Sequence, residues 1–116
     1  MAEEALRFPF DRDDWRHVLL RRAGDACLVE RTNLRTESVH WEVIVVQHRA
    51  AETSQRGRAY PAREVYPNTE QWGEAGWSFT ERSLADARMA ALTQHRSRQA
   101  TRRPPPRVGH AGGSGA

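Results

Sequence analysis

Apolar and polar residues alternate along much of the first half of this chain, and the alternation predicts β-strands. Residues 15–33 are expected to form a hairpin, because the Gly-Asp pair at 24–25 suits a two-residue type II′ turn. A turn at that place sets Leu20 opposite Val29. The hairpin would then gather four apolar side chains on one face: Val18, Leu20, Cys27 and Val29.

Residues 39–48 form the strongest predicted strand. Val39, Trp41, Val43 and Val45 alternate onto one face, and β-branched residues dominate. The other face begins polar and becomes apolar, in the order His40, Glu42, Ile44 and Val46. Half of this strand is therefore expected to be covered on both sides, by a C-terminal helix or by another subunit.

The second half of the chain alternates between turn signals and short elements. Residues 51–59 are a polar loop, and Pro61 and Pro67 restrict residues 62–65 to an edge strand or an extended segment. Two glycines and two tryptophans in residues 68–80 predict a turn that leads into a short strand at 77–80.

A helix is expected from an N-cap at Ser83 to about Gln94, after which arginine, proline, glycine and serine dominate. Its apolar stripe is formed by Leu84, Ala87, Ala91 and Leu92, with Met89 at the margin.

These elements predict an α+β fold, in which a small antiparallel sheet of about four strands packs on one C-terminal helix. Residues 1–14 are expected to be irregular and pinned by Phe8 and Phe10. Residues 15–94 would form the single domain, and residues 95–116 a disordered basic tail. No apolar run approaches the ~20 residues that a membrane span needs.

Charge is divided unevenly along the chain. The 116 residues carry a net charge of +3, and all 18 basic residues are arginines. The tail has no acidic residue, whereas the rest of the chain has a net charge of −2. The arginines of the tail are Arg96, Arg98, Arg102, Arg103 and Arg107.

Such a tail suits an anionic partner, because mobile guanidinium groups bind phosphates without a fixed geometry. It contains no aromatic residue on which a base could stack, so binding to nucleic acid would be non-specific. A solubilising spacer and a proline-dependent protein ligand around residues 104–106 remain alternatives.

The tryptophan-glycine segment at 72–77 is a second candidate. Trp72, Gly73 and Trp77 could form a partner-binding surface, since amphipathic rings are common at interfaces. The alternative is that both rings cap the core of the sheet while the glycines form the turn.

Candidate catalytic and metal-binding residues do not converge in the sequence. His40-x-Glu42 occurs in zinc deaminases, but their Pro-Cys-x-x-Cys motif is absent, and His48 lies about 26 Å farther along a strand. We therefore expect a solvated polar face, no metal, no cofactor and no enzyme. Cys27, the only cysteine, is expected to be a buried structural thiol. A pocket in which His17 or His40 meets Cys27 or a carboxylate would reopen the question of an enzyme.

Two resemblances bear on function. The first is carried by residues 40–43, 60–61, 64–67, 72–73 and 76–80 with Leu84, Ala87 and Leu92. At these positions the chain resembles small uncharacterised phage- and plasmid-associated proteins of GC-rich bacteria. Trp72-Gly73 and Gly76 are also similar to the WGR domain, a nucleic-acid-associated module, although Glu74 stands where that family has its arginine.

The expected function is that of a small non-enzymatic accessory protein from a mobile element, which contacts nucleic acid through its arginine-rich tail. The alternative is a protein-binding module, an inhibitor or assembly adaptor, that acts through the folded body around Trp72 and Trp77. The acidic N-terminal residues lack the order of a signal peptide, and a lone cysteine forms no internal disulfide, so we expect a cytoplasmic location.

Overall fold

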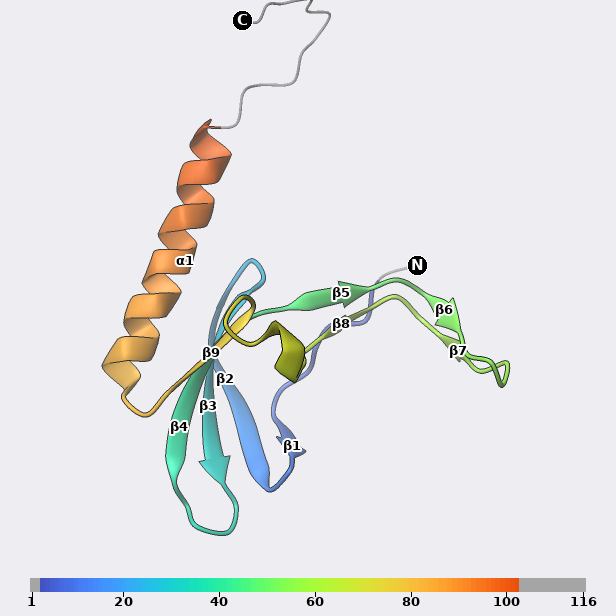
Figure 1. Ribbon diagram of the computed structural model, residues 1–116, viewed down its shortest axis with the longest axis horizontal. Helices are drawn as coiled ribbons and strands as arrows, with labels where there is room; N and C mark the ends of the chain where they lie inside the picture. Colours follow the sequence, from blue (N-terminus) through green and yellow to red (C-terminus); the bar gives the residue numbers. More distant parts are fainter. Residues whose placement is uncertain (1–2, 103–116) are drawn as a thin grey trace, which may run out of the picture.

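A computed structural model describes residues 3–102, with side chains to Gln94, and its architecture is α+β. The described residues form one five-stranded antiparallel sheet in the order β1-β2-β3-β4-β9, and the C-terminal helix α1 packs on one of its faces (Figure 1). The bounds are β1 Phe10–Arg12, β2 Trp15–Ala23, β3 Ala26–Asn33, β4 Val39–Val45, β9 Gly76–Phe79 and α1 Arg82–Arg102. The predicted fold class is confirmed.

The hairpin of β2 and β3 turns where the sequence predicts. Ala23 pairs with Ala26 across the turn, and Gly24 has a φ of 61°, the positive value that a type II′ turn requires at its first central residue. A β-bulge between Leu19 and Arg21 then shifts the register, so that Leu19 lies opposite Val29. The predicted pairing of Leu20 with Val29 is wrong. Val18 and Leu20 are consequently exposed, at 38% and 36%.

A strand and a turn also occur in the segment that was expected to be irregular. β1 pairs with β2 through a two-residue turn, Asp13–Asp14, whose φ angles are 52° and 67°. Positive φ at both central residues is the signature of a type I′ turn. The N-terminal segment therefore extends the sheet by one strand.

The sheet has an apolar layer on each side. We call the side that α1 covers the helix face; its core consists of Ala26, Leu28 and Val43 with Ala85 and Met89 from the helix. The opposite face buries Cys27, Val29, Ile44 and Val46. This second layer is covered by Leu6, Phe8, Leu19, Tyr66 and Trp72. The central part of β4 is thus covered on both sides, as predicted, by the helix on one side and by segments of the same chain on the other.

Helix α1 presents a different stripe to the sheet from the one predicted. Ala85 and Met89 are fully buried and Leu92 packs beside them, a spacing of four and three residues that keeps them on one helical face. Leu84 is 51% exposed, and Ala87 and Ala91 are exposed as well. The helix begins at Arg82, so Ser83 lies within its first turn, and it continues beyond Gln94 to Arg102.

Two short ribbons extend from the sheet. β5 (Gln47–Arg49) pairs with β8 (Arg63–Val65), which confirms the predicted extended segment, and β6 (Glu52–Thr53) pairs with β7 (Ala59–Tyr60) farther out (Figure 1). A 3₁₀ turn, η1 (Thr69–Gln71), leads back toward β9. In the part of the chain that the structure describes, no helix is both long and apolar enough to cross a membrane.

Candidate functional site: a polar hollow on the opposite face

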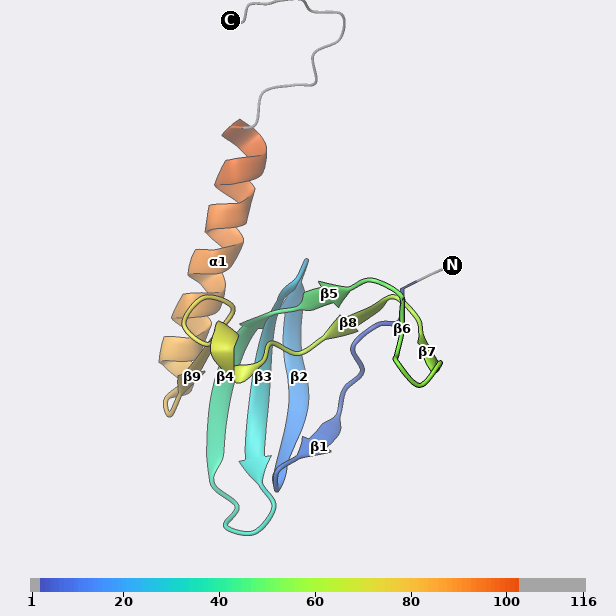
Figure 2. The same ribbon diagram turned by 45° about the vertical axis from the view of Figure 1, so that its right-hand side comes forward.

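Three neighbouring strands each contribute one polar side chain to the opposite face. His17 of β2 pairs with Arg31 of β3, and Arg31 pairs with His40 of β4. Glu42 lies two residues beyond His40 and so points to the same side of the sheet. Strand pairing therefore brings His17, Arg31 and Glu42 together. Figure 2 shows β2, β3 and β4 side by side.

Glu42 is the centre of this group. Only 4% of the residue is exposed, and its carboxylate accepts hydrogen bonds from three side chains. Arg31 Nη1 donates at 2.6 Å, the Tyr66 hydroxyl at 2.5 Å and the Ser78 hydroxyl at 3.3 Å. Both carboxylate oxygens are engaged, so the buried charge is compensated by one guanidinium and two hydroxyl groups.

Aromatic rings surround the ion pair of Arg31 and Glu42. The guanidinium carbon of Arg31 lies 4.2 Å from the centre of the Trp15 ring, a cation–π contact. The ring of His40 lies 5.2 Å from that of Trp15, and the Trp72 indole N–H donates to Ser78 at 3.2 Å.

Together these side chains border a hollow of about 360 Å³, which we call the polar hollow. Its lining residues are Arg12, Asp13, Trp15, His17, Arg31, Glu42, Tyr66, Pro67, Asn68, Thr69 and Trp72. A hollow of about 440 Å³ lies along the β5–β8 ribbon. Although it is the larger of the two, its lining lacks the buried Glu42 and His17, so the polar hollow is the better candidate site.

Burial sets the protonation of two lining groups. The ring of His17 stacks on Phe10 with centres 4.4 Å apart, and burial lowers the pKa of His17, although the nearby Glu42 acts in the opposite direction. Burial, together with the charge of Glu42, raises the pKa of the Tyr66 phenol. At neutral pH the hollow therefore offers a neutral imidazole and a protonated phenol.

The solvated polar face predicted around Glu42 is wrong, because Arg31 from the neighbouring strand and Tyr66 from the segment after β8 both donate to that carboxylate. The sequence identifies no partner for His17, but in the structure His17 and Glu42 line the same hollow. This is the convergence that would reopen the question of an enzyme. Since both oxygens of Glu42 already accept hydrogen bonds and His17 is packed on Phe10, the arrangement suits the holding of a ligand better than proton transfer.

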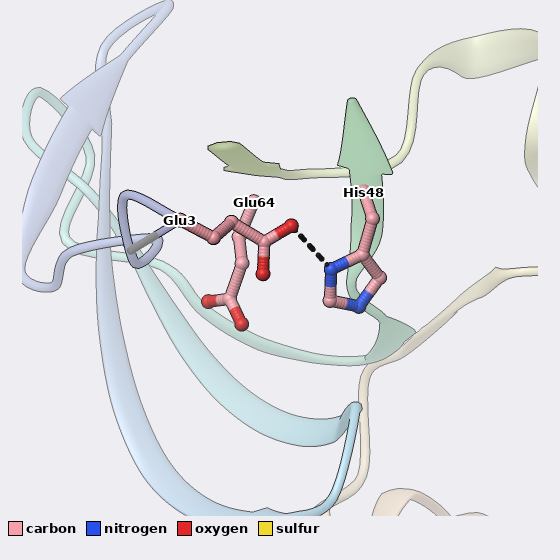
Figure 3. Close-up of side chains that lie close together, drawn as sticks. All are labelled: Glu3, His48 and Glu64. Carbon is pink, nitrogen blue, oxygen red and sulfur yellow. Dashed lines mark hydrogen bonds and ion pairs between the residues drawn. The ribbon is translucent and has the colours of Figure 1, made fainter. Parts of the chain in front are cut away.

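A second cluster of ionisable side chains lies near the N-terminus, where Glu3, His48 and Glu64 have potential ligand atoms within 4.8 Å of one another (Figure 3). His48 does not share a strand face with His40, because β4 ends at Val45 and His48 belongs to β5. Its Nδ1 lies 2.8 Å from Glu3, and its Nε2 lies 2.9 Å from Asp25. Two carboxylates on one imidazole favour the imidazolium ion and raise the pKa of His48.

Glu64 is occupied in a similar way. Arg22 donates to both of its oxygens at 2.9 and 2.8 Å, and the backbone N–H of Leu6 adds a third hydrogen bond. These bonds, the one from Arg22 first, lower the pKa of Glu64 to about 2. A cation would have to displace a guanidinium and a proton, so this cluster is a set of ion pairs that ties the N-terminal segment to the sheet.

The candidate partner-binding residues do not form one surface. Trp72 packs on the opposite face, and Trp77 packs on the helix face with Arg88 4.7 Å above its ring. Gly73 lies in the turn between them, with a φ of 97°. Cys27 is fully buried, and burial raises its thiol pKa to about 11, as expected of a structural cysteine.

The tail arginines fall partly within α1. The backbone at Arg96, Arg98 and Arg102 is helical, and Arg103 and Arg107 lie outside the described residues. Comparison of the chain with protein-family models, curated proteins and solved structures finds no match. The resemblances to phage- and plasmid-associated proteins and to the WGR domain therefore stay predictions.

Proposed function

We propose that this chain is a small accessory protein that binds nucleic acid through its basic C-terminal arm, residues 95–116. The observation that carries the proposal is the length of α1. Among the helix residues whose side chains the structure describes, Leu92 is the last that packs on the sheet, and the helix backbone continues to Arg102 and projects beyond the sheet (Figure 1). At 1.5 Å per residue, residues 95–102 add about 10 Å of helix.

The charge of this projecting segment supports a polyanionic partner. Residues 95–102 contain three arginines and no acidic residue. A helix of this kind fits the major groove of a duplex, and its guanidinium groups would bind phosphates with release of counterions. The arm acts as an electrostatic tether, and the folded body, with its own net charge of −2, is carried on it. We place this activity in the cytoplasm, where a buried free thiol such as Cys27 stays reduced.

The proposal is tested with three forms of the full chain and a fluorescent DNA duplex. One variant carries Arg96→Gln, Arg98→Gln and Arg102→Gln. A control carries Arg49→Gln, Arg56→Gln and Arg58→Gln, which removes the same charge from exposed positions in β5 and in the loop between β6 and β7. We expect the arm variant to lose at least about tenfold in affinity and the control about threefold or less. Equal losses would show that net charge alone, and not the arm, governs binding.

A specific observation favours the protein-binding module as a second candidate. On the helix face α1 packs against β3, β4 and β9. Val18 of β2 and Val39 of β4, each 38% exposed, lie on the remaining part of that face, and Leu20 at the bulge is 36% exposed. Exposed apolar side chains in one area are typical of contact surfaces. If the full chain binds no DNA but sediments as a dimer, and Val18→Ser abolishes the dimer, this second function is supported.

A further inference from the structure

We propose that the polar hollow binds one unpaired base of a single-stranded nucleic acid. The proposal deepens the proposed function, because the arm would hold the phosphates of the same strand. It rests, however, on contacts of the opposite face that are independent of the arm.

The first argument is the lining of the hollow. Trp15, Tyr66 and Trp72 contribute aromatic rings from three separate segments of the chain. Trp15 is only half-buried and is backed by the guanidinium of Arg31 at 4.2 Å, which fixes its ring. Base stacking needs a fixed, accessible aromatic surface of this kind. The arm itself contains no aromatic residue, so the hollow supplies what the arm lacks.

The second argument is charge. Arg12 and Arg31 line the hollow together with Asp13 and Glu42, and the imidazole of His17 is neutral, so the lining carries no net charge. A metal ion would face two guanidinium groups, and an isolated phosphate would face two carboxylates. A neutral, planar heterocycle meets neither penalty.

The third argument is an incomplete hydrogen-bond network. The Nε of Arg31 is buried, and it donates to no acceptor among the residues that the structure describes. Asn68 and Thr69 add exposed polar side chains to the lining of the hollow. A base carbonyl or ring nitrogen would supply acceptors to such donors. The site therefore combines stacking surfaces with a few polar groups, which is the composition that base recognition needs.

The position of the hollow favours a single strand over a duplex. α1 packs on the helix face and contacts the edge strand β9. The hollow lies on the opposite face, where its lining residue Trp72 donates to Ser78 of the same strand. A chain that touches both must bend around this edge. A flexible single strand can do so, but a short duplex is too stiff.

The test uses the full chain with a single-stranded oligonucleotide and a duplex of the same length. Trp15→Leu removes the stacking surface, and Trp41→Leu on the helix face is the matched control for a half-buried tryptophan. We expect Trp15→Leu to weaken single-strand binding about tenfold, within the range for one stacked base, and to leave duplex affinity unchanged. Trp41→Leu should change neither affinity.

A second measurement keeps the proposal falsifiable if Trp15→Leu does not fold. Adenosine, guanosine, cytidine and thymidine are each added to the wild-type chain, and the indole N–H resonances of the four tryptophans are followed by NMR. Shifts at Trp15 and Trp72, without shifts at Trp41 and Trp77, support the hollow. Absence of shifts with all four nucleosides overturns it, even if the arm binds duplex DNA. If the nucleosides shift the Trp15 and Trp72 resonances but the chain binds no duplex, the proposal for the arm is overturned and the one for the hollow stands.

Discussion

Gly76 lies directly against the indole ring of Trp72. A Cβ added at this glycine would lie 2.5 Å from the Trp72 ring, closer than any side chain tolerates. The contact explains why a glycine opens β9, and it holds Trp72 over the opposite face, where its N–H reaches Ser78.

We therefore predict that Gly76→Ala displaces Trp72 and lowers the free energy of unfolding by about 1–3 kcal/mol. Gly57→Ala is the contrasting control, because Gly57 has a left-handed φ of 83° but open space around it, whereas Gly76 has no left-handed φ and is limited only by the Trp72 ring. Only the strain of a left-handed alanine, about 1 kcal/mol, is expected at Gly57. Urea denaturation measures both. A free energy of unfolding unchanged by Gly76→Ala would mean that the Trp72 ring moves aside freely.

The buried ion pair gives a second prediction. Glu42→Leu leaves the guanidinium of Arg31 without its carboxylate, and removal of one partner from a buried pair costs about 3–5 kcal/mol. The double variant Glu42→Leu/Arg31→Met removes both charges and should recover most of that loss. A double variant less stable than Glu42→Leu would show that the charges of Glu42 and Arg31 do not compensate each other.

The imidazole of His48 gives a prediction on pH. Its pKa is raised by Glu3 and Asp25, so the imidazolium stabilises the fold. This contribution is fully present below the ordinary histidine value of about 6.5 and is lost as the pH rises through the raised pKa. His48→Gln should therefore lower the melting temperature at pH 5.5 and have little effect at pH 9. If His48→Gln lowered the melting temperature equally at both pH values, the ion pairs of His48 would not be the cause of the lost stability.

The turn between β1 and β2 gives a fourth prediction. Asp13 and Asp14 both have positive φ, which Asn-Gly adopts at lower cost in a type I′ turn. Replacement of the pair by Asn-Gly should raise the free energy of unfolding by about 1 kcal/mol. Differential scanning calorimetry checks the direction, and a lower melting temperature would show that the aspartate side chains themselves stabilise the turn.

The sequence predicts the fold better than the site. Alternation and turn residues were enough for β2, β3 and β4, because those signals are local. The bulge at Leu20 has no such signal, yet it decides that Leu19 and not Leu20 joins the core. The predicted stripe of α1 was partly right: Met89 and Leu92 pack on the sheet, but Ala85 takes the place of Leu84, which lies outside the contact.

The polar hollow depends on contacts between distant segments. His17, Arg31 and Glu42 become neighbours only once the order of the strands is known, and Tyr66 reaches Glu42 from a segment beyond the ribbons. No spacing rule links these four positions. The paired strands were nevertheless predictable, and polar residues at matching positions of adjacent strands are the signal that a search for such sites should use.

The most direct test of the nucleic-acid account is the salt dependence of duplex binding by the full chain. The logarithm of the association constant is plotted against the logarithm of salt concentration for the wild type and for the arm variant with Arg96, Arg98 and Arg102 changed to glutamine. If the arm binds phosphates, the wild-type slope is steep, and the variant loses roughly 0.9 units of slope for each phosphate contact removed. An unchanged slope in the variant, or no wild-type binding at about 0.1 M salt, would contradict the proposed function.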